Sequence, residues 1–243
     1  MPANHFDEPV AAMYDDLSAD MFAPEVLDPT IDVLTELVGP GRAALELAVG
    51  TGRVALPLAE RGVRVHGIEL SAAMLRRLHA KPGSERVSTT EGDMTSTRVD
   101  GRFGLVYLVF NTVANVTTQD GQVAVFANAA AHLEPGGHFL VEVGVPLLQS
   151  VPVGERFHVF ARTEEHLGID EYDVATQQMW SHHHRFSSNG CHRTSIPFRY
   201  VWPSELDLMA RLAGMRLVHR WSGWDRAPFT ADSTAHVSVW QVG

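Results

Sequence analysis

Hydrophobic and polar positions along residues 43–143 predict five buried strands separated by helices. The expected strands are residues 43–49, 63–68, 86–90, 103–110 and 138–143, of which 86–90 is the weakest. Residues 43–49 and 103–110 are short, nearly continuous apolar runs, as expected when both faces of a strand are covered. Between the strands, apolar residues recur at helical spacing and stop at breakers such as Pro82-Gly83. Strands that alternate with helices in this way predict a parallel sheet with right-handed crossovers and helices on both faces.

The pattern changes after Pro146. From about residue 156 to residue 200 the chain is rich in strand formers and turns, and Asn189-Gly190 is typical of a tight hairpin turn. A helix is then expected at 203–213, followed by strands at 215–221 and 236–242. The expected parts are an N-terminal core, 1–145, an antiparallel insertion covering the acceptor site, 146–201, and a return to the core sheet, 202–243.

Composition narrows the classes of partner. The formal net charge is −10, and no basic run is longer than Arg76-Arg77, so a nucleic-acid partner is not expected. The single cysteine cannot form an internal disulfide or a cysteine metal cage. No leader-like segment and no apolar stretch of roughly 20 residues is seen, so a cytoplasmic location without membrane contact is expected. The oligomeric state is left open.

A glycine turn follows the first expected strand. In an open α/β sheet, ligands bind where strands end and helices begin, and Gly50-Thr51-Gly52 lies at that position. Glycine allows the backbone to approach a ligand closely. Residues 50–55 also satisfy the dinucleotide pattern G-x-G-x-x-A, so a nicotinamide-dependent oxidoreductase is one alternative.

Three acidic residues lie in or directly after the first three strands. Glu69 can accept hydrogen bonds from both hydroxyls of a ribose, and Asp93 can accept one from an adenine amino group while Met94 packs on the ring. Glu46 can order the loop and face an amino group through water. A cationic ligand without phosphate tolerates such an acidic rim better than a pyrophosphate does.

With these residues in place, the sequence resembles the class I S-adenosylmethionine-dependent methyltransferases. The matching segments are Leu45–Arg53, Gly67–Ser71 with Met74-Leu75, Glu91–Met94 and Leu133–Gly137. The resemblance implies a doubly wound, Rossmann-like, mostly parallel α/β sheet of seven strands, with the antiparallel insertion after strand five. It implies S-adenosyl-L-methionine as the cofactor, bound by Tyr14, Glu46, Ala48, Gly50, Gly52, Arg53, Glu69, Leu70, Met74, Asp93, Met94 and Phe110. Ala48 departs from the family, in which many members have glycine there.

Within this family, the sequence looks most like bacterial tailoring methyltransferases of sugars or secondary metabolites. The expected reaction is methyl transfer to a hydroxyl or amino group of a small metabolite, with oxygen slightly favoured over nitrogen. A protein that binds the cofactor without turnover is a further alternative. No metal ion is expected.

A hydroxyl acceptor needs a general base, and histidine is a natural candidate near neutral pH. In the insertion, a two-residue turn at Asn189-Gly190 would pair His183 with Ile196 and place His183 on the inward face. His183, His182 and Asn111 are therefore the candidate catalytic residues, with Asn111 expected beside the transferring methyl group. An ordinary role for these histidines in the strand is the simpler alternative.

Overall fold

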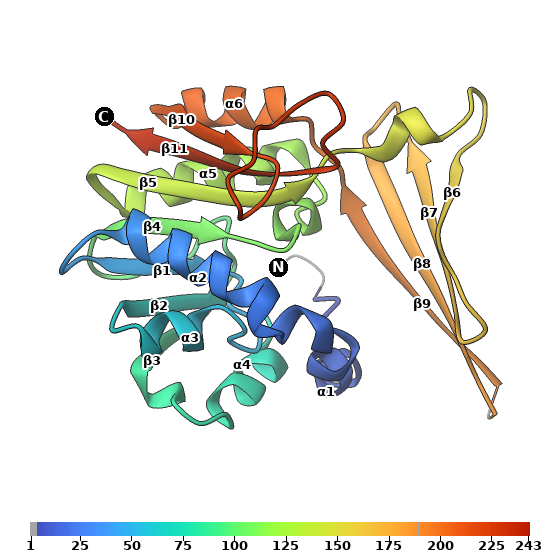
Figure 1. The fold of residues 1–243 in the computed structure, drawn as a ribbon, viewed down its shortest axis with the longest axis horizontal. Coiled ribbons are helices and arrows are strands. Elements are labelled where there is room, and N and C mark those ends of the chain that lie inside the picture. Colours follow the sequence, from blue (N-terminus) through green and yellow to red (C-terminus); the bar gives the residue numbers. More distant parts are fainter. Residues whose placement is uncertain (1–3, 189) are drawn as a thin grey trace.

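The structure is a computed structural model that describes residues 4–188 and 190–243, in which two sheets lie side by side (Figure 1). The large sheet has seven strands and the small sheet has four. The strands of the large sheet are β1 (Ala43–Leu47), β2 (Arg64–Glu69), β3 (Val87–Glu91), β4 (Phe103–Leu108), β5 (Leu133–Gly144), β10 (Met215–Trp221) and β11 (Ala235–Val242). Those of the small sheet are β6 (Phe157–Arg162), β7 (His166–Asp173), β8 (Gln178–Ser187) and β9 (Gly190–Arg199).

The large sheet has the strand order β10-β11-β5-β4-β1-β2-β3. Its five strands from β5 to β3 are parallel to one another, whereas β11 runs antiparallel to both β5 and β10. This arrangement confirms the expected fold, a mostly parallel seven-stranded sheet with an antiparallel insertion after the fifth strand. The order reverses between β1 and β4, where ligands bind in such sheets.

Helices cover both faces of this sheet (Figure 1). They are α1 (Glu8–Leu17), α2 (Pro24–Val38), α3 (Ala55–Glu60), α4 (Ala72–His79), α5 (Gln119–His132) and α6 (Pro203–Leu212), with short 3-10 turns at Ala19–Phe22, Ser84–Arg86, Thr112–Asn115 and Leu147–Ser150. The apolar residues of α2 and α3 belong to one core cluster, those of α5 and α6 belong to a second, and a third, smaller cluster joins α1 to α4. In the described part of the chain, no helix is long and apolar enough to cross a membrane.

The central strands are buried because their side chains are apolar on both faces. Every residue of β4 is buried, and Ala44 to Leu47 of β1 are buried as well. Val49 packs directly against the backbone of Gly67 in β2. A Cβ at position 67 would lie only 2.6 Å from the Cβ of Val49, so a larger residue does not fit there. The strand therefore fits beside the loop that follows β1 only with glycine at this position.

The insertion forms the small antiparallel sheet, but its hairpin register differs from the expected one. Gly190 begins β9 and pairs with Ser187, so His183 lies opposite Thr194 rather than Ile196. The expected pairing is therefore wrong by two residues, because the tight turn comes one residue earlier than expected. Asn189 lies outside the described residues. A shift of two residues keeps each side chain on its expected face, since side chains alternate with a period of two.

A buried ion pair joins the small sheet to the helices. Arg199, at the end of β9, pairs with Glu205 of α6 at 3.0 Å and donates to the Gln122 side chain of α5 at 2.6 Å. The Arg199 side chain is only 5% exposed. The sheet is thus anchored at the end where β8 begins and β9 ends. The expected division into 1–145, 146–201 and 202–243 stays a prediction.

Candidate cofactor and acceptor site

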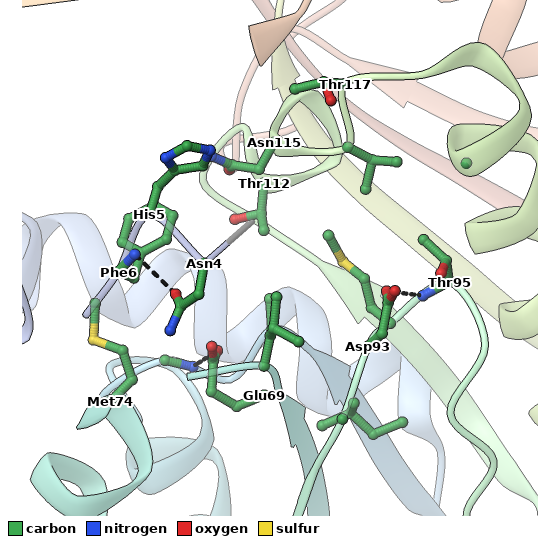
Figure 2. Close-up of a pocket in the computed structure, with 18 of the residues that line it drawn as sticks. Asn4, His5, Phe6, Glu69, Met74, Asp93, Thr95, Thr112, Asn115 and Thr117 are labelled. Atoms are coloured by element: carbon green, nitrogen blue, oxygen red, sulfur yellow. Dashed lines mark hydrogen bonds between the residues drawn. The ribbon is translucent and has the colours of Figure 1, made fainter. Parts of the chain in front are cut away.

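A cavity of about 440 Å³ opens at the carboxyl ends of β1, β2 and β3 (Figure 2). One side is formed by the loops that follow these strands, and the opposite side by the segment that leads into α5. Its lining residues are Asn4, His5, Phe6, Tyr14, Ala48, Gly50, Ile68, Glu69, Leu70, Met74, Gly92, Asp93, Met94, Thr95, Thr112, Asn115, Val116, Thr117, Thr118 and Gly121. The volume lies in the range that holds a small organic ligand.

The loop after β1 turns sharply because three of its residues take left-handed conformations. The φ angles are +58° at Ala48, +56° at Gly50 and +83° at Gly52. Glycine adopts this region freely, whereas alanine does not. Ala48, where many family members have glycine, therefore holds a backbone conformation that glycine would adopt more easily.

Glu69 ties this loop to the next one. Its Oε2 accepts the Gly50 N–H at 2.9 Å, and its Oε1 accepts the Ser71 N–H at 2.8 Å. Burial raises the pKa of the Glu69 carboxyl, while the hydrogen bonds from Ser71 and Gly50 oppose this rise. A carboxylate offers about four lone-pair positions, so Glu69 keeps acceptor capacity toward the cavity.

Asp93 follows β3 and lies on the cavity wall opposite Met74 (Figure 2). Its Oδ1 accepts the Thr95 N–H at 2.9 Å, which fixes the side chain at the start of a turn. Met94 lines the cavity and also packs against the apolar cluster below it.

Glu46 lies below the loop rather than on the cavity wall. Its Oε2 accepts the Tyr107 hydroxyl hydrogen at 2.9 Å, and the residue is only 3% exposed. Burial raises the pKa of Glu46 to about 8, although the Tyr107 hydrogen bond and the Arg53 charge oppose that rise. Burial also raises the pKa of Tyr107. A neutral Glu46 carboxyl therefore supports the loop from beneath near neutral pH.

The N-terminal segment crosses the cavity and is fixed to α4 and the cofactor loop. The Ser71 hydroxyl donates to the Phe6 carbonyl, and Tyr14 packs edge-on against the Phe6 ring. Lys81 binds Asp15 at 2.6 Å and the Thr51 carbonyl at 2.8 Å. Burial raises the pKa of the Tyr14 hydroxyl. Residues that precede the first strand by about 40 positions thus complete the cavity.

Beyond β4, the chain turns through two left-handed residues, Phe110 and Asn111. The Phe110 ring lies under the Arg53 guanidinium, with 5.0 Å from its carbon to the ring centre. The Asn111 side-chain oxygen accepts the Gly144 N–H of β5. Thr112 and Asn115, just beyond this turn, line the cavity.

The contacts of the two histidines of β8 lie within the small sheet. The His183 ring bonds His166 at 3.0 Å and packs edge-on against Phe160. Burial and the neighbouring His166 lower the pKa of His183. His182 bonds the Ser195 hydroxyl at 2.8 Å. Among the described residues, the cavity lining includes neither His182 nor His183.

Eight of the twelve expected cofactor residues come together on the cavity wall. They are Tyr14, Ala48, Gly50, Glu69, Leu70, Met74, Asp93 and Met94. The other four lie behind or beside the cavity, and they are Glu46, Gly52, Arg53 and Phe110. Sequence reasoning missed the N-terminal residues Asn4 to Phe6 and the run from Asn115 to Gly121, because only tertiary packing brings them to the cavity.

Comparison with known proteins places this site in a family. The family description "Methyltransferase domain" matches residues 44–137, the segment that carries β1 to the start of β5. The solved CcbJ methyltransferase of Streptomyces caelestis is 35% identical, superposes with a TM-score of 0.82, and aligns over 91% of this chain and 97% of its own. The chain belongs to the S-adenosylmethionine-dependent methyltransferases, and its cofactor is S-adenosylmethionine.

Two curated relatives also align with the chain. The cypemycin N-terminal methyltransferase of a Streptomyces species is 28% identical over 79% of this chain and 80% of its own. The dTDP-3-amino-3,4,6-trideoxy-alpha-D-glucopyranose N,N-dimethyltransferase of Streptomyces venezuelae is 37% identical over 31% of each chain. The glycine spacing that also suggested a dinucleotide site therefore belongs here to a methyltransferase loop.

Proposed function

We propose that the protein transfers the methyl group of S-adenosylmethionine to an amine of a secondary metabolite or sugar. The observation that carries this proposal is the likeness to two relatives that by name methylate amines. A hydroxyl acceptor needs a base in its transition state, whereas an amine only has to arrive unprotonated. Neither His183 nor His182, the bases that favoured oxygen, lines the described cavity, and the histidine that does line it is His5.

The cavity has the donor and acceptor groups that the cofactor needs. Glu69 would accept the ribose hydroxyls, Asp93 the adenine amino group, and Met94 would pack on the adenine. Ala48, Gly50, Leu70, Met74 and Tyr14 would enclose the rest. When bound, the cofactor supplies an electrophilic methyl group on a sulfonium, and the protein holds the acceptor in line with it. Positioning of this kind can lower a barrier by roughly 7–11 kcal/mol.

The acceptor would enter from the side of Thr112 to Gly121, which faces the cofactor residues across the cavity. A second hollow of about 370 Å³ shares Thr117 and Thr118 with the first. Its other lining residues are Gln119, Ala175, Thr176, Gln177, Gln178 and Arg199. These side chains are almost all polar, which suits an acceptor with a hydroxylated or amide-rich body.

Two relatives support nitrogen as the methylated atom. By name, one of them methylates the N-terminus of cypemycin and the other dimethylates an aminosugar nucleotide. Both come from Streptomyces. This likeness, together with the cavity lining, makes amines the first acceptors to test.

The test is a radiolabelled methyl-transfer assay over matched acceptor pairs. Each pair has the same scaffold with either an amino or a hydroxyl group, and the panel includes aminosugars, their nucleotide-linked forms and short peptides with free N-termini. Transfer to amines is expected, with a rate that rises with pH until the acceptor amine is deprotonated. Transfer to hydroxyl members alone would refute the proposal, and cofactor binding without any transfer would favour a non-catalytic binding protein.

Two histidine variants sharpen the result. His183→Ala should leave turnover unchanged, because the contacts of His183 lie within the small sheet. His5→Ala should change the KM of the acceptor or cofactor, because His5 lines the cavity. A loss of about tenfold or more in His183→Ala, with cofactor affinity retained, would instead restore His183 as the base of a hydroxyl methyltransferase.

A further inference from the structure

Two consecutive residues without glycine's freedom adopt left-handed conformations at the end of β4. Phe110 has φ = +58° and Asn111 has φ = +60°. Side chains make this conformation costly, so it persists only where surrounding contacts hold it, and such residues gather at functional sites. Ala48, directly after the neighbouring strand β1, is in the same conformation. The contacts that hold Phe110 and Asn111 therefore show which residues fix this turn beside the cavity.

The Glu142 carboxylate supplies the central contact. Its Oε2 accepts the Phe110 N–H at 2.8 Å, and its Oε1 accepts the Trp224 indole N–H at 2.8 Å. The Glu142 main-chain carbonyl accepts the Asn111 N–H at 3.2 Å. Asn111 in turn accepts the Gly144 N–H through its side chain. The turn is thus bound to β5 by three hydrogen bonds, and Glu142 accepts two of them, one through its carboxylate and one through its main-chain carbonyl.

This turn leads directly into the acceptor side of the cavity. The Thr112 hydroxyl donates to the Val109 carbonyl at 2.7 Å, which bridges the turn, and both Thr112 and Asn115 line the cavity. The cofactor side has its own support, because Glu69 binds the loops after β1 and β2. A change at Glu142 should therefore move the acceptor side more than the cofactor side, which the turn contacts through the Phe110 ring against Arg53.

We propose that Glu142 is a positioning residue for methyl transfer. Its carboxylate holds the left-handed turn at Phe110 and Asn111 and so sets where Thr112 and Asn115 stand relative to the cofactor. The role rests on the methyltransferase activity and does not depend on whether the acceptor atom is nitrogen or oxygen. Trp224, from the segment between β10 and β11, fixes the second carboxylate oxygen and keeps the side chain directed at the turn.

Three variants separate the two hydrogen bonds. Glu142→Ala removes both side-chain acceptors, whereas Trp224→Phe removes the indole donor and keeps an aromatic ring. Glu142→Gln offers one acceptor oxygen and turns an amide NH₂ toward the other donor, so it should give an intermediate result. Trp224→Phe is the matched control, because it leaves the bond from Phe110 to Glu142 intact.

The first measurement is amide hydrogen exchange of residues 109–118, together with the affinity for S-adenosylhomocysteine by calorimetry. In Glu142→Ala, exchange of this segment should rise about tenfold, the factor that corresponds to a lost hydrogen bond to a charged group. In Trp224→Phe it should change less than about threefold, and affinity for S-adenosylhomocysteine should stay within about threefold in both variants. Unchanged exchange in Glu142→Ala, or a collapse of cofactor affinity with it, would overturn the assignment.

The second measurement is the kinetic split with an acceptor found by the matched panel. Glu142→Ala should lower kcat, or raise the KM of the acceptor, while the KM of S-adenosylmethionine is retained. Full turnover in Glu142→Ala would overturn the assignment. If Glu142→Ala fails to fold, Glu142→Gln is measured in its place with the same criteria. The exchange and calorimetry use no acceptor, so they decide the role of Glu142 even if the amine proposal is wrong.

Discussion

The protein should become less stable as the pH rises from about 5 to 8, and replacing Glu46 by glutamine should abolish most of this loss of stability. Burial raises the pKa of Glu46 from its usual 4.5 to about 8. Below the lower value the carboxyl is protonated in both the folded and the unfolded chain. Between the two values only the unfolded chain releases the proton, so the free energy of unfolding falls as the pH rises.

The magnitude follows from the two pKa values. Each pKa unit is worth about 1.36 kcal/mol, so the full effect is at most about 5 kcal/mol. That is a large share of the roughly 5–15 kcal/mol that stabilises a typical domain. Glutamine does not titrate and its side-chain oxygen can still accept the Tyr107 hydroxyl hydrogen. Any fixed cost of the substitution cancels when one variant is compared across pH.

The assay is urea unfolding of both proteins at several pH values, without cofactor. The wild type should lose stability from about pH 5 to pH 8, and Glu46→Gln should lose several kcal/mol less over the same range. Glu25→Gln, on the exposed side of α2, is the matched control and should follow the wild type. Parallel curves for the wild type and Glu46→Gln would show that Glu46 titrates normally and that the reasoning is wrong.

Three further substitutions test other parts of the structure. Ala48→Gly should raise the free energy of unfolding by about 1 kcal/mol. The left-handed conformation costs alanine about 1–2 kcal/mol, and the greater chain entropy of glycine in the unfolded state cancels part of the gain. A lower Tm would contradict this. Asp15→Asn, which breaks the half-exposed pair with Lys81, should weaken S-adenosylhomocysteine binding about twofold to fivefold in calorimetry at low salt; unchanged affinity would separate α1 from cofactor binding. Arg199→Met leaves the Glu205 carboxylate without its cation and should lower urea-unfolding stability by about 3 kcal/mol; wild-type stability would show that the pair anchors nothing.

The core of the fold could be predicted from the sequence because its signals are local. The runs that became β1 and β4 are almost entirely apolar, which is typical of a parallel strand covered on both faces. Serine is a common residue at the start of a helix, and the Ser71 side chain accepts the Met74 N–H at 3.3 Å in α4. Strand ends were less predictable, since Phe110 was assigned to β4 but lies in the left-handed turn beyond it.

The cofactor side of the site could also be predicted, because its residues follow strands whose order the pattern specifies. The acceptor side could not. His5 reaches the cavity through the docking of α1 onto α4, and Asn115 reaches it through a turn held by Glu142, neither of which leaves a periodic signal. His183 was attractive as a titratable group near neutral pH, yet its ring contacts His166 of β7 and Phe160 of β6, two neighbours that the hairpin pattern at 189–190 does not specify.

The chain contains a single lysine, Lys81, and this residue lies where α1 meets the cofactor loop. Its amine binds Asp15 of α1 and also the Thr51 carbonyl of the loop after β1, so only the first of these bonds depends on the docking of α1. Amine-reactive reagents therefore have one lysine side chain in this sequence as their target. We expect Lys81 to be labelled faster when the pair with Asp15 is broken, so its labelling rate is a chemical probe of the docking of α1 that requires no engineered residue.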